Sequence, residues 1–507
     1  MAAQRLLAVD LGASGGKCFV GTFDRDRFTI DEIHRFAHEG VDFYIKDRNG
    51  TITQRTFWDH TFLYHNVIQG LHAFRRDVGD RLDGIGIDTW GADGQFVTAD
   101  GDLVGKVYCY RDHRLDTMID AVQQRIDPAR VYELTGIHFQ PFNVSGQLLW
   151  FMDHRADRLT EGCRFLPMPS IFYHDLGGVH AVDSTFASVT QLMDAHTGEW
   201  SPEMLEALGI PPAVMPEIVA PGAVVGRLLE PIAAAVGLNA CPLVAVGSHD
   251  TASAFAAAPV RNADEALIIS SGTWSLVGKL VPEPITTAAA RAASLSNEGG
   301  IGNIRLLRNC MGTWLVQELR RGWARADGRE TDWDELNRLT AAAPAFRTLI
   351  DPDCADFYNP PDMQAAIDAF CRQTGQPGPE SRGMYLRTVY ESLALSYSEI
   401  DAMLCRVAGR QSKVVNIVGG GCKNEMLNQF TANATGMPVV AGPDEATAAG
   451  NLMVQALGLG ILGSMGDVQD YIGQAFPVKR YTPQDPVAWQ EAADRFRRVR
   501  DRGSAAK

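Results

Sequence analysis

The sequence predicts an α/β protein whose two halves share one architecture, a mixed sheet covered by helices. Each half opens with two apolar runs separated by a glycine-containing turn. In the first half the runs are residues 6–11 and 18–23, with the turn at 12–16. In the second half the runs are residues 266–271 and 274–280, with the turn at 272. Such a pattern predicts a β-hairpin. Its recurrence indicates a duplicated architecture, with the boundary between the halves near residues 248–262.

The segments between and after the hairpins support this fold class. In the first half, the patterns predict a buried strand, a hairpin around Asp100-Gly101 and a helical region, at residues 84–90, 92–103 and 115–136. In the second half they predict a strand at residues 414–418, a triple-glycine turn at 419–421 and a helix at 424–435. A further strand at 437–441 and a helix at 446–457 follow. This order favours helices packed on mixed sheets. The basic segment 489–502 predicts a solvated helix.

Length and charge limit the classes of function. The chain has 507 residues, enough for about two to four domains that each bury a core. Its 61 acidic residues outnumber the 46 basic ones, for a formal net charge of −15. This balance disfavours nucleic acids as partners, because their phosphate backbones would be repelled. The net charge does not exclude a pocket for a small molecule, even a negatively charged one.

The cysteines and the apolar runs bear on the compartment. The nine cysteines are scattered without a CxxC pair or a zinc-like Cys/His spacing, which predicts reduced thiols, although a Cys354–Cys371 bridge stays possible. The first residues lack the apolar run of a signal peptide. The longest uncharged stretch, residues 446–466, is interrupted by glycines and predicts a buried helix with its exit loop. We therefore expect a cytoplasmic protein with no membrane partner.

The first candidate site is the N-terminal turn, Asp10-Leu-Gly-Ala-Ser-Gly-Gly-Lys17. Its glycines let backbone amides turn toward an anion, its lysine adds positive charge, and its aspartate can order a Mg²⁺ ion through water. The turn could therefore hold phosphate groups. It is not a P-loop, because Leu11 and Cys18 stand where that motif needs Gly and Ser or Thr.

Two other interpretations of this turn remain. Gly12, Ser14 and Gly16 match the GxSxG nucleophile elbow of serine hydrolases, with Ser14 as the nucleophile. That elbow is followed by a helix, whereas here a strand is predicted. The turn can also be an ordinary hairpin turn without a ligand.

The second candidate is Gly247-Ser-His-Asp-Thr251, which follows an apolar run and precedes a segment suited to a helix. A carboxylate at this point can take a proton from a hydroxyl group as a general base, and Asp250 is our candidate for that role. Simple N-capping by Asp250 explains the pattern equally well. His249 is more typical of a packing or orienting residue than of a ligand.

Three further segments carry polar or flexible groups. Thr273, in the hydroxyl-rich turn Ser270-Ser-Gly-Thr-Trp-Ser275, offers neutral donors to a phosphoryl group, and Gly419-Gly-Gly421 permits close approach by a planar ligand such as adenine. Asp88-Thr-Trp-Gly-Ala-Asp93 and Arg111-Asp-His-Arg114 contain groups of the kind that line sugar pockets. Ordinary turns or surface ion pairs are the alternatives. A GxGxxG match at residues 458–463 follows a helix, so it does not indicate a dinucleotide site.

Taken together, these segments resemble the FGGY carbohydrate kinases of the actin-like ATPase superfamily. The likeness spans nearly the whole chain, and the order and spacing of its motifs are specific although each motif alone is weak. The motifs are Val9-Asp-Leu-Gly-Ala-Ser14, Ile85-Gly-Ile-Asp-Thr-Trp-Gly91, Tyr110-Arg-Asp112, Ser248-His-Asp-Thr-Ala-Ser253, Ser270-Ser-Gly-Thr-Trp-Ser275, Asn297-Glu-Gly-Gly300, Asn309-Cys-Met-Gly312 and Ile417-Val-Gly-Gly-Gly-Cys422.

The resemblance implies two domains of ribonuclease-H type around a central cleft. Residues 1–250 would mainly bind the sugar, residues 260–480 would mainly bind ATP, and residues 485–507 would form a terminal helix or tail. The implied reaction is ATP-dependent phosphorylation of the C1 hydroxyl of a ketose, with L-rhamnulose expected first and L-fuculose or another ketose as the alternative. The implied cofactors are ATP and Mg²⁺, and the protein would be a monomer or a homodimer.

The resemblance also assigns roles to residues. Asp250 would be the general base, and Asp10 would hold Mg²⁺ through water. The residues implied to bind ATP are Asp10, Ala13, Ser14, Gly15, Gly16, Lys17, Thr273, Gln317, Gly419, Gly420 and Gly421. The residues implied to bind the sugar are Trp90, Gly91, Asp93, His249, Thr251 and Asn309.

Two segments depart from the family pattern. Gly15 and Lys17 stand where Ser and Arg are usual, which keeps the charge but loses a hydroxyl group and a fork of donors. Gly94 stands where the pattern that the chain otherwise follows has Phe, which predicts open space beside the sugar and bears on which sugar is preferred. A catalytically silent sugar sensor with this fold is a further alternative, which the intact Asp10, Asp250 and glycine turn disfavour.

Overall fold

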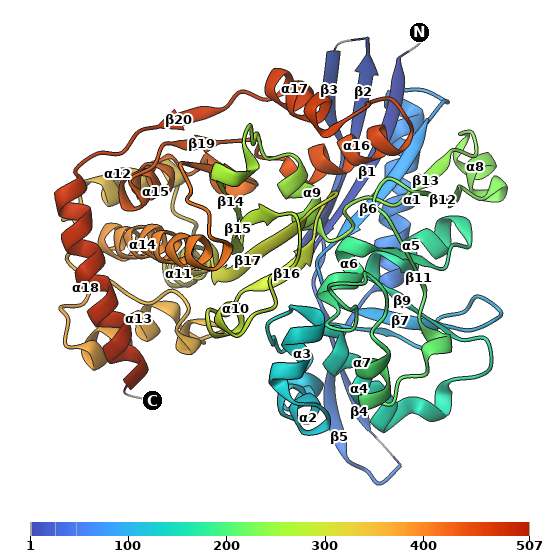
Figure 1. Cartoon of the computed structure of the whole chain (residues 1–507), viewed down its shortest axis with the longest axis horizontal. Coiled ribbons are helices and arrows are strands. Elements are labelled where there is room, and N and C mark those ends of the chain that lie inside the picture. Colours follow the sequence, from blue (N-terminus) through green and yellow to red (C-terminus); the bar gives the residue numbers. More distant parts are fainter. Residues whose placement is uncertain (1–2, 26, 47, 506–507) are drawn as a thin grey trace. The chain divides into compact units, whose positions relative to one another are not determined.

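The computed structural model describes residues 3–25, 27–46 and 48–505. The chain forms two compact units, drawn in Figure 1, and neither unit is continuous in sequence. Unit 1 contains Met1–Ala257, Leu280–Leu306 and Glu445–Phe476, and unit 2 contains Ala258–Lys279, Leu307–Asp444 and Pro477–Lys507. Unit 1 therefore includes a segment from near the C-terminal end of the sequence.

A mixed sheet is the centre of unit 1. Its strand order is β12-β13-β6-β1-β2-β3, in which β1 pairs antiparallel with β2 and parallel with β6. The predicted first hairpin is confirmed, because β1 and β2 are joined by a turn at Ala13 and Ser14. The strands of this unit are β1 (Gln4–Gly12), β2 (Gly15–Asp24), β3 (Arg27–Ala37), β4 (Val41–Lys46), β5 (Ile52–Trp58), β6 (Gly84–Thr89), β7 (Gly94–Val97), β8 (Val107–Tyr108), β9 (Arg164–Pro167), β10 (Ala181–Asp183), β11 (Glu217–Val219), β12 (Val224–Arg227), β13 (Pro242–Val244) and β16 (Ser296–Gly299).

Helices cover this sheet and extend it. Apolar residues of α1 (His60–Asp77) pack with apolar residues of β1 and β6 in one buried cluster, which includes Leu63, Val67, Leu71, Val9 and Ile87. The other helices of unit 1 are α2 (Met118–Arg125), α3 (Pro128–Thr135), α4 (Val144–Arg155), α5 (Met168–Gly177), α6 (Ser184–Val189), α7 (Pro202–Ala207), α8 (Glu230–Val236), α9 (Asp250–Ala256), α10 (Ala288–Ala292), α16 (Ala446–Gly458) and α17 (Met465–Ala475).

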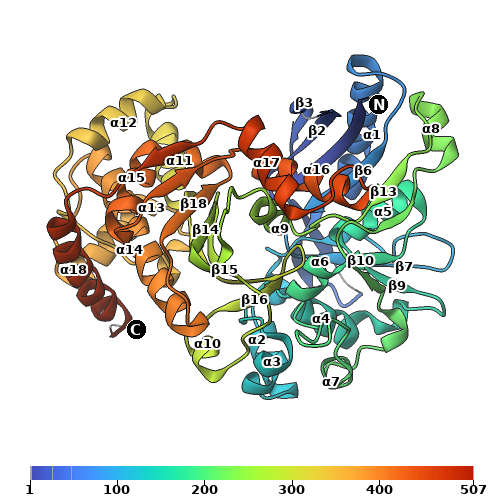
Figure 2. The ribbon, with the colours of Figure 1, turned by 45° about the horizontal axis from the view of Figure 1, so that its top comes forward.

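Helix α16 lies against β1 and β6 and crosses α9 at close range, as Figure 2 shows. It is the buried helix that the uncharged stretch predicted, since ten of its residues from Ala446 to Ala456 are buried. The close approach depends on Gly450, because a Cβ atom built there would lie 1.8 Å from the backbone oxygen of Ser253 in α9. The two helix backbones can therefore approach only where a side chain is absent.

We expect Gly450→Ala to lower the thermal unfolding midpoint, because the added methyl group must push α16 away from α9, at a cost of about 1–3 kcal/mol. Gly473→Ala in α17 is the matched control, since a Cβ there meets no atom within 4 Å. That control removes a helical glycine at an open position and is expected to be neutral or stabilising by up to about 1 kcal/mol. Equal shifts of the midpoint in the two variants would contradict the packing argument.

Unit 2 repeats the strand pattern of unit 1. Its first strand, β14 (Ala266–Ser271), pairs antiparallel with β15 (Trp274–Val281) and parallel with β18 (Val414–Val418), as β1 pairs with β2 and β6. β18 pairs parallel with β19 (Val439–Ala441), which pairs antiparallel with β20 (Lys479–Tyr481), and β17 (Ile304–Met311) lies on the other side of β15. The α/β fold class and the duplicated architecture are thus confirmed.

The helices of unit 2 include the long α14 (Arg382–Ala408), which packs on α12 and α15. The others are α11 (Trp314–Asp327), α12 (Trp333–Ala342), α13 (Met363–Thr374), α15 (Glu425–Thr435) and α18 (Pro486–Ala505). α15 begins after its cap residue Asn424 and ends at Gly436, as predicted. Cys371 is a buried free thiol, so its possible bridge to Cys354 is not formed. Within the described residues, no helix is both long and apolar enough to cross a membrane.

Three sequence predictions need correction. The expected hairpin at residues 92–103 is only a short one, in which Val97 bridges Leu103 and the Thr98 N–H donates to the Asp102 carbonyl at 2.8 Å, while β7 pairs along its length with β9. The helical region 115–136 is split into α2 and α3, since Pro128 starts a new helix. The terminal helix α18 is not fully solvated, because one face of it buries Trp489, Ala492, Phe496 and Val499.

Candidate active site

The carboxyl ends of β1 and β6 lie together at one edge of the sheet of unit 1. Asp10 and Asp88 are register partners in this parallel pair. The segment that leads into α9 joins the same edge, because the backbone N–H of Thr89 donates to the carbonyl of Ser248 at 2.9 Å. Asp10, Asp88 and Asp250, which are far apart in sequence, are thereby brought to one place.

Asp88 is fully buried and accepts a hydrogen bond from a side chain of α16. The Asn451 side-chain amide donates to Asp88 Oδ2 at 2.5 Å, and Gln455 Nε2 donates both to Asn451 Oδ1 at 2.7 Å and to the carbonyl of Leu7 at 3.0 Å. Burial and the neighbouring Asp10 charge raise the pKa of Asp88 well above the usual carboxyl value. Asp88 therefore favours its neutral form beside a second carboxyl group.

Asp10 is only half-buried, and the charges of its neighbours shift its pKa. Burial and the negative charge of Asp250 raise the pKa of Asp10, and the charge of Lys17 lowers it. The Lys17 ammonium group makes an ion pair of 2.7 Å with Glu445. Lys17 is thus fixed near the turn, where it was predicted to add positive charge.

The glycines of the turn are required by its packing on β3. A Cβ at Gly15 would lie 2.8 Å from the carbonyl of Phe36, and one at Gly16 would lie 2.3 Å from the Phe36 ring. The Ser14 carbonyl accepts a bond from the backbone N–H of His38, whose Nε2 bonds the carbonyl of Gly12 at 2.7 Å. Because Ser14 lies between two antiparallel strands, it is not on a strand-to-helix elbow, and the serine hydrolase interpretation is wrong.

Asp250 is the first residue of α9, and its neighbour His249 is the N-cap. The Asp250 carboxylate accepts a 2.6 Å bond from the backbone N–H of Thr251, and no capping bond forms from His249. The simple N-cap interpretation is therefore wrong. Burial raises the pKa of Asp250, while the His249 charge and the Thr251 N–H oppose that rise. A carboxylate that is more basic than usual suits proton abstraction.

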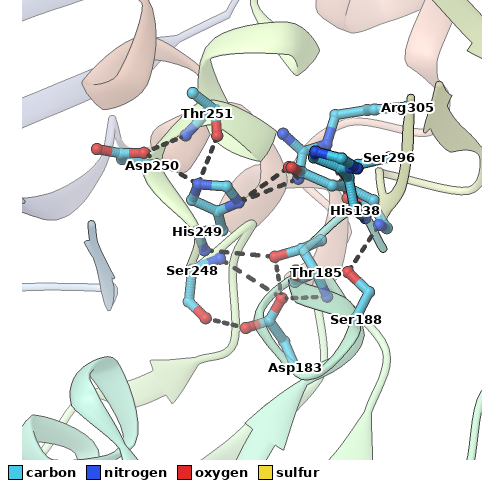
Figure 3. A network of polar contacts seen from close by, with 12 residues as sticks. His138, Asp183, Thr185, Ser188, Ser248, His249, Asp250, Thr251, Ser296 and Arg305 are labelled. Atoms are coloured by element: carbon cyan, nitrogen blue, oxygen red, sulfur yellow. Dashed lines mark hydrogen bonds and ion pairs between the residues drawn. The ribbon is translucent and has the colours of Figure 1, made fainter. Parts of the chain in front are cut away.

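His249 is held by a network of buried polar groups, shown in Figure 3. Its Nε2 atom pairs with the Thr251 hydroxyl at 2.7 Å, and its Nδ1 atom lies 3.3 Å from Glu298. Arg305 is fully buried, lies 3.1 Å from Glu298, and donates from Nε to the carbonyl of Gly299 at 2.8 Å. The network fixes the His249 ring between Thr251 and the Glu298–Arg305 pair.

A second set of contacts supports the strand end before His249. Asp183, at the end of β10, accepts a hydrogen bond from the Ser248 hydroxyl and one from the backbone N–H of Thr185 at 2.9 Å. Burial raises the pKa of Asp183 to about 6. These contacts, also visible in Figure 3, anchor the chain where it enters α9.

Glu298 and Arg305 were not predicted as site residues. Glu298 lies within the motif Asn297-Glu-Gly-Gly300, and Arg305 stands in the otherwise apolar run of residues 304–307. A charge within a buried strand was the signal that could have indicated them, since such charges need a partner.

Gly91 lies beside His249, and its neighbours Trp90 and Asp93 bond each other. A Cβ at Gly91 would lie 2.6 Å from His249 Nε2, so the glycine is needed for this approach. Asp93 has a left-handed backbone with φ of 74°, and its Oδ2 atom accepts bonds from the indole N–H groups of Trp58 at 2.7 Å and of Trp90 at 2.9 Å. The centroids of the two indole rings are 4.4 Å apart. Trp58 is a further residue that the sequence did not single out.

The Asp93 carboxyl is fully buried and retains bonding capacity. Its Oδ1 atom has no hydrogen-bond partner among the described residues. Burial raises the pKa of Asp93, while the two indole donors lower it. A buried acceptor atom without a partner is rare in a folded protein, and a bound polar ligand is one partner that it can accept from.

Two expectations about this region change. Gly94 does not open space, because a Cβ there would lie 2.5 Å from the Phe165 ring and 2.6 Å from the Leu166 carbonyl of β9. In the segment Arg111-Asp-His-Arg114, Arg114 is buried and bonds the Cys109 carbonyl and Gln147, and Asp112 accepts a 2.6 Å bond from the Thr56 backbone N–H. These two side chains therefore hold unit 1 together rather than lie on its surface.

In unit 2 the turn between β14 and β15 carries Thr273. The carbonyl of Thr273 accepts bonds from the backbone N–H groups of Gly312 at 3.1 Å and Trp314 at 3.2 Å. The Thr313 hydroxyl donates to the Gly272 carbonyl at 2.8 Å and accepts from Gln317 Nε2 at 3.1 Å. Thr273 and Gln317 therefore lie on neighbouring segments. Asn309, on β17, has a buried Oδ1 atom without a partner among the described residues.

The triple glycine follows β18. Gly419 has a positive φ of 82°, and a Cβ at Gly421 would lie 2.1 Å from the Ser271 hydroxyl, so neither position accepts a side chain. A Cβ at Gly420 would meet no atom within 4 Å, so this backbone faces open space. Gly419 and Gly421 thus form the close backbone packing, and Gly420 is the glycine that a ligand can approach.

Comparisons with known proteins agree with this architecture along nearly the whole chain. The family model of the N-terminal domain of the FGGY family of carbohydrate kinases matches residues 6–256, and that of the C-terminal domain matches residues 267–459. A rhamnulokinase of Bacteroides thetaiotaomicron is 39% identical over 495 residues, which is 97% of this chain and 99% of the relative. A rhamnulokinase of Pectobacterium carotovorum subsp. carotovorum is 37% identical over 490 residues, 96% of this chain and 94% of the relative.

Solved structures show the same fold. A xylulose kinase from Lactobacillus acidophilus aligns with a TM-score of 0.78 and 17% identity over 98% of both chains. Plasmodium falciparum glycerol kinase with ADP aligns with a TM-score of 0.77 and 15% identity, over 99% of this chain and 98% of that one. At such low identity these likenesses concern the fold alone.

Two mixed-sheet units of similar strand pattern, the carboxylates at the strand ends of unit 1 and the two family matches define a carbohydrate kinase. The chain belongs to the FGGY family of carbohydrate kinases. Like the rhamnulokinases, to which it is similar over nearly its full length, it is an ATP-dependent sugar kinase.

Proposed function

We propose that this enzyme transfers the γ-phosphoryl group of ATP to the C1 hydroxyl of L-rhamnulose, giving L-rhamnulose 1-phosphate and ADP. The identity of 36–39% to rhamnulokinases over nearly the whole chain supports this substrate. The observation that carries the chemistry is the position of the Asp250 carboxylate beside His249 and Thr251, at the edge of the sheet that also presents Asp10.

In this proposal Asp250 accepts the proton of the C1 hydroxyl as its oxygen attacks the γ-phosphorus atom and the bond to the β-phosphate oxygen breaks. The buried partners of His249 hold its ring so that it can bond the sugar together with Thr251. Gly91 leaves room for that ring, and the free Oδ1 atom of Asp93 offers an acceptor for a sugar hydroxyl. Trp90 is a further proposed sugar contact in unit 1. Asn309 is a proposed sugar contact in unit 2.

Each unit by itself contains residues that we propose to contact ATP. In unit 1 they are the turn residues Ala13, Ser14, Gly15 and Gly16 with Lys17, whose amides and ammonium group provide positive potential for phosphate oxygens. In unit 2 they are Thr273, Gln317, Gly419, Gly420 and Gly421, of which Gly420 presents open backbone. Phosphoryl transfer is catalysed chiefly by positioning and charge neutralisation, so these contacts would supply most of the rate enhancement.

The residues present fit a Mg²⁺ ion bound with the nucleotide. Among the described residues, no three His, Cys, Asp or Glu side chains form a cluster that could hold a metal. Mg²⁺ needs only one or two carboxylates when water and phosphate oxygens complete its shell. Asp10 is half-buried, and the repulsion from Asp250 that raises its pKa would be relieved by a cation. Bound Mg²⁺ would neutralise phosphate charge there, with Asp10 holding it through water.

L-Fuculose is the second candidate substrate, because the sequence Ala92-Asp93-Gly94 departs from the pattern that the chain otherwise follows. The sugar specificity then depends on the walls around Asp93, which are Trp58, Trp90 and, behind Gly94, Phe165. The assignment of the sugar mainly to residues 1–250 and of ATP mainly to residues 260–480 is part of this proposal.

We expect ATP-dependent ADP release with L-rhamnulose at a higher kcat/KM than with L-fuculose, L-ribulose, D-xylulose or glycerol. A coupled assay of ADP over this panel, with product phosphate located by NMR, is the measurement. Preference for another sugar would mean that the side chains around Asp93 select that sugar, and it would leave the kinase chemistry in place. Release of ADP with none of the sugars would overturn the proposed reaction and favour a silent sensor.

A further inference from the structure

The hairpin of β4 and β5 presents an unusual amount of apolar surface. The strand order of its sheet is β4-β5-β8, so β4 forms an outer edge. All six residues of β4 are exposed, with Tyr44 at 74% and Ile45 at 44%, and Ile52 on β5 is 64% exposed. Because side chains alternate along a strand, Tyr44 and Ile45 point to opposite faces, so both faces of this edge expose apolar side chains, which indicates a contact site.

The edge of β4 is protected against strand pairing only near its ends, by the charges of Asp42 and Lys46. Edge strands expose unpaired backbone N–H and C=O groups and are normally blocked by a bulge, a proline or a central charge. β4 pairs with β5 in an unbroken register from Val41 to Lys46, without a bulge. Its sequence is Val-Asp-Phe-Tyr-Ile-Lys, in which the centre is apolar and aromatic. Among the described residues, no strand pairs with the outer side of β4.

We propose that this edge pairs with β4 of a second copy of the chain, antiparallel and about a two-fold axis at Tyr44. In that register Tyr44 lies opposite Tyr44 of the second copy, Phe43 lies opposite Ile45, and Asp42 lies opposite Lys46. Each dimer then contains two Asp–Lys pairs and two aromatic–β-branched pairs, which are favourable cross-strand neighbours. The same patch serves both copies, as an isologous interface requires.

The charges select this register over others. Asp42 is held in place on the hairpin, because its carboxylate accepts bonds from the Thr56 hydroxyl at 2.7 Å and the Gln54 amide at 2.9 Å. An antiparallel register centred on Phe43 would place Asp42 opposite Tyr44 and leave both charges without partners. Parallel stacking would place Asp42 beside Asp42 and Lys46 beside Lys46, which is repulsive. The pattern therefore favours a closed dimer over an open-ended stack.

Tyr44→Cys tests the geometry directly. Directly opposite residues in an antiparallel pair are close enough for a disulfide, so mild oxidation should convert this variant to a covalent dimer. Val487→Cys is the matched control, because Val487 is 72% exposed on α18 and lies outside the proposed interface. A covalent dimer of the Tyr44 variant alone, seen by non-reducing electrophoresis, supports the proposal. Equal cross-linking of both variants, or of neither, would overturn it.

A charge exchange tests the register. By sedimentation equilibrium of the full chain, Lys46→Asp should weaken the dimer by at least about tenfold, because it places two carboxylates opposite each other twice per dimer. Combining Asp42→Lys with Lys46→Asp restores opposite charges and should recover the dimer. Thermal unfolding midpoints check that the hairpin variants are folded. A wild-type chain that is monomeric at every concentration, or a dimer unaffected by Lys46→Asp, would overturn the proposal.

This inference does not depend on the sugar or on Asp250, since the interface consists of β4 alone. Sugar phosphorylation by the wild-type chain and by the Tyr44 variant can be measured in the same preparations. Failure of the dimer test would therefore leave the proposed kinase function untouched.

Discussion

Asp250→Asn is expected to reduce turnover by at least about 10²–10⁴-fold, because the amide cannot accept the proton of the attacking hydroxyl. The substitution preserves the shape of the side chain and an oxygen that can still accept the 2.6 Å bond from the Thr251 backbone N–H. Sugar and ATP binding, measured by calorimetry, should therefore stay close to wild type while ADP release is lost.

Asp100→Asn is the control for this change, since Asp100 is exposed in the turn after β7 and is not one of the proposed site residues. It should leave turnover unchanged. If the Asp250 variant kept its turnover, the general base would have to be another group. Asp10 would then be the next candidate, because it lies at the same edge of the sheet.

Arg305→Met is expected to lower the free energy of unfolding by about 3–5 kcal/mol, because it leaves Glu298 buried without its positive partner. Arg305 is completely buried, lies 3.1 Å from Glu298 and also bonds the Gly299 carbonyl. The charge of Arg305 helps to lower the pKa of Glu298 against the effect of burial. Without that charge the pKa of Glu298 should rise, so acidification should neutralise Glu298 and reduce the destabilisation.

Arg347→Met provides a matched control, because Arg347 pairs with Glu380 at the surface. The two side chains are 41% and 71% exposed, respectively. Exposed pairs contribute about 0–1 kcal/mol, so this variant should lose little. Denaturant unfolding of both variants at two pH values is the measurement. Adding Glu298→Gln to Arg305→Met should recover part of the loss, since the buried charge is removed. Equal losses for the two arginine variants would contradict a special role of the buried pair.

Much of the site could be predicted from its motifs. Asp10, Lys17, Asp250 and Thr273 each stand beside a turn whose glycines or hydroxyl residues are visible in the sequence, and the resemblance gave them roles. Trp58, Glu298 and Arg305 were missed. They act through contacts to Asp93 and His249, and those contacts join strands and loops that are far apart in the sequence.

The sequence by itself determined the local elements and the family. The two opening hairpins, β18, α15 with its Asn424 cap and Gly436 end, and the buried α16 all follow from patterns within a few residues, because hydrogen bonds in turns and helices are local. The repeat of these patterns was enough to predict the duplicated α/β architecture.

Only the tertiary structure decided which distant segments meet. It placed α16, from near the end of the chain, on β1 and β6, paired β7 with the distant β9, and filled the space beside Gly94 with Phe165. The apolar pattern of a strand or helix specifies that one face must be buried, but many partners could bury it equally well. The choice among them depends on the close packing of the whole unit, such as the contact of Gly450 with Ser253, which no local pattern contains.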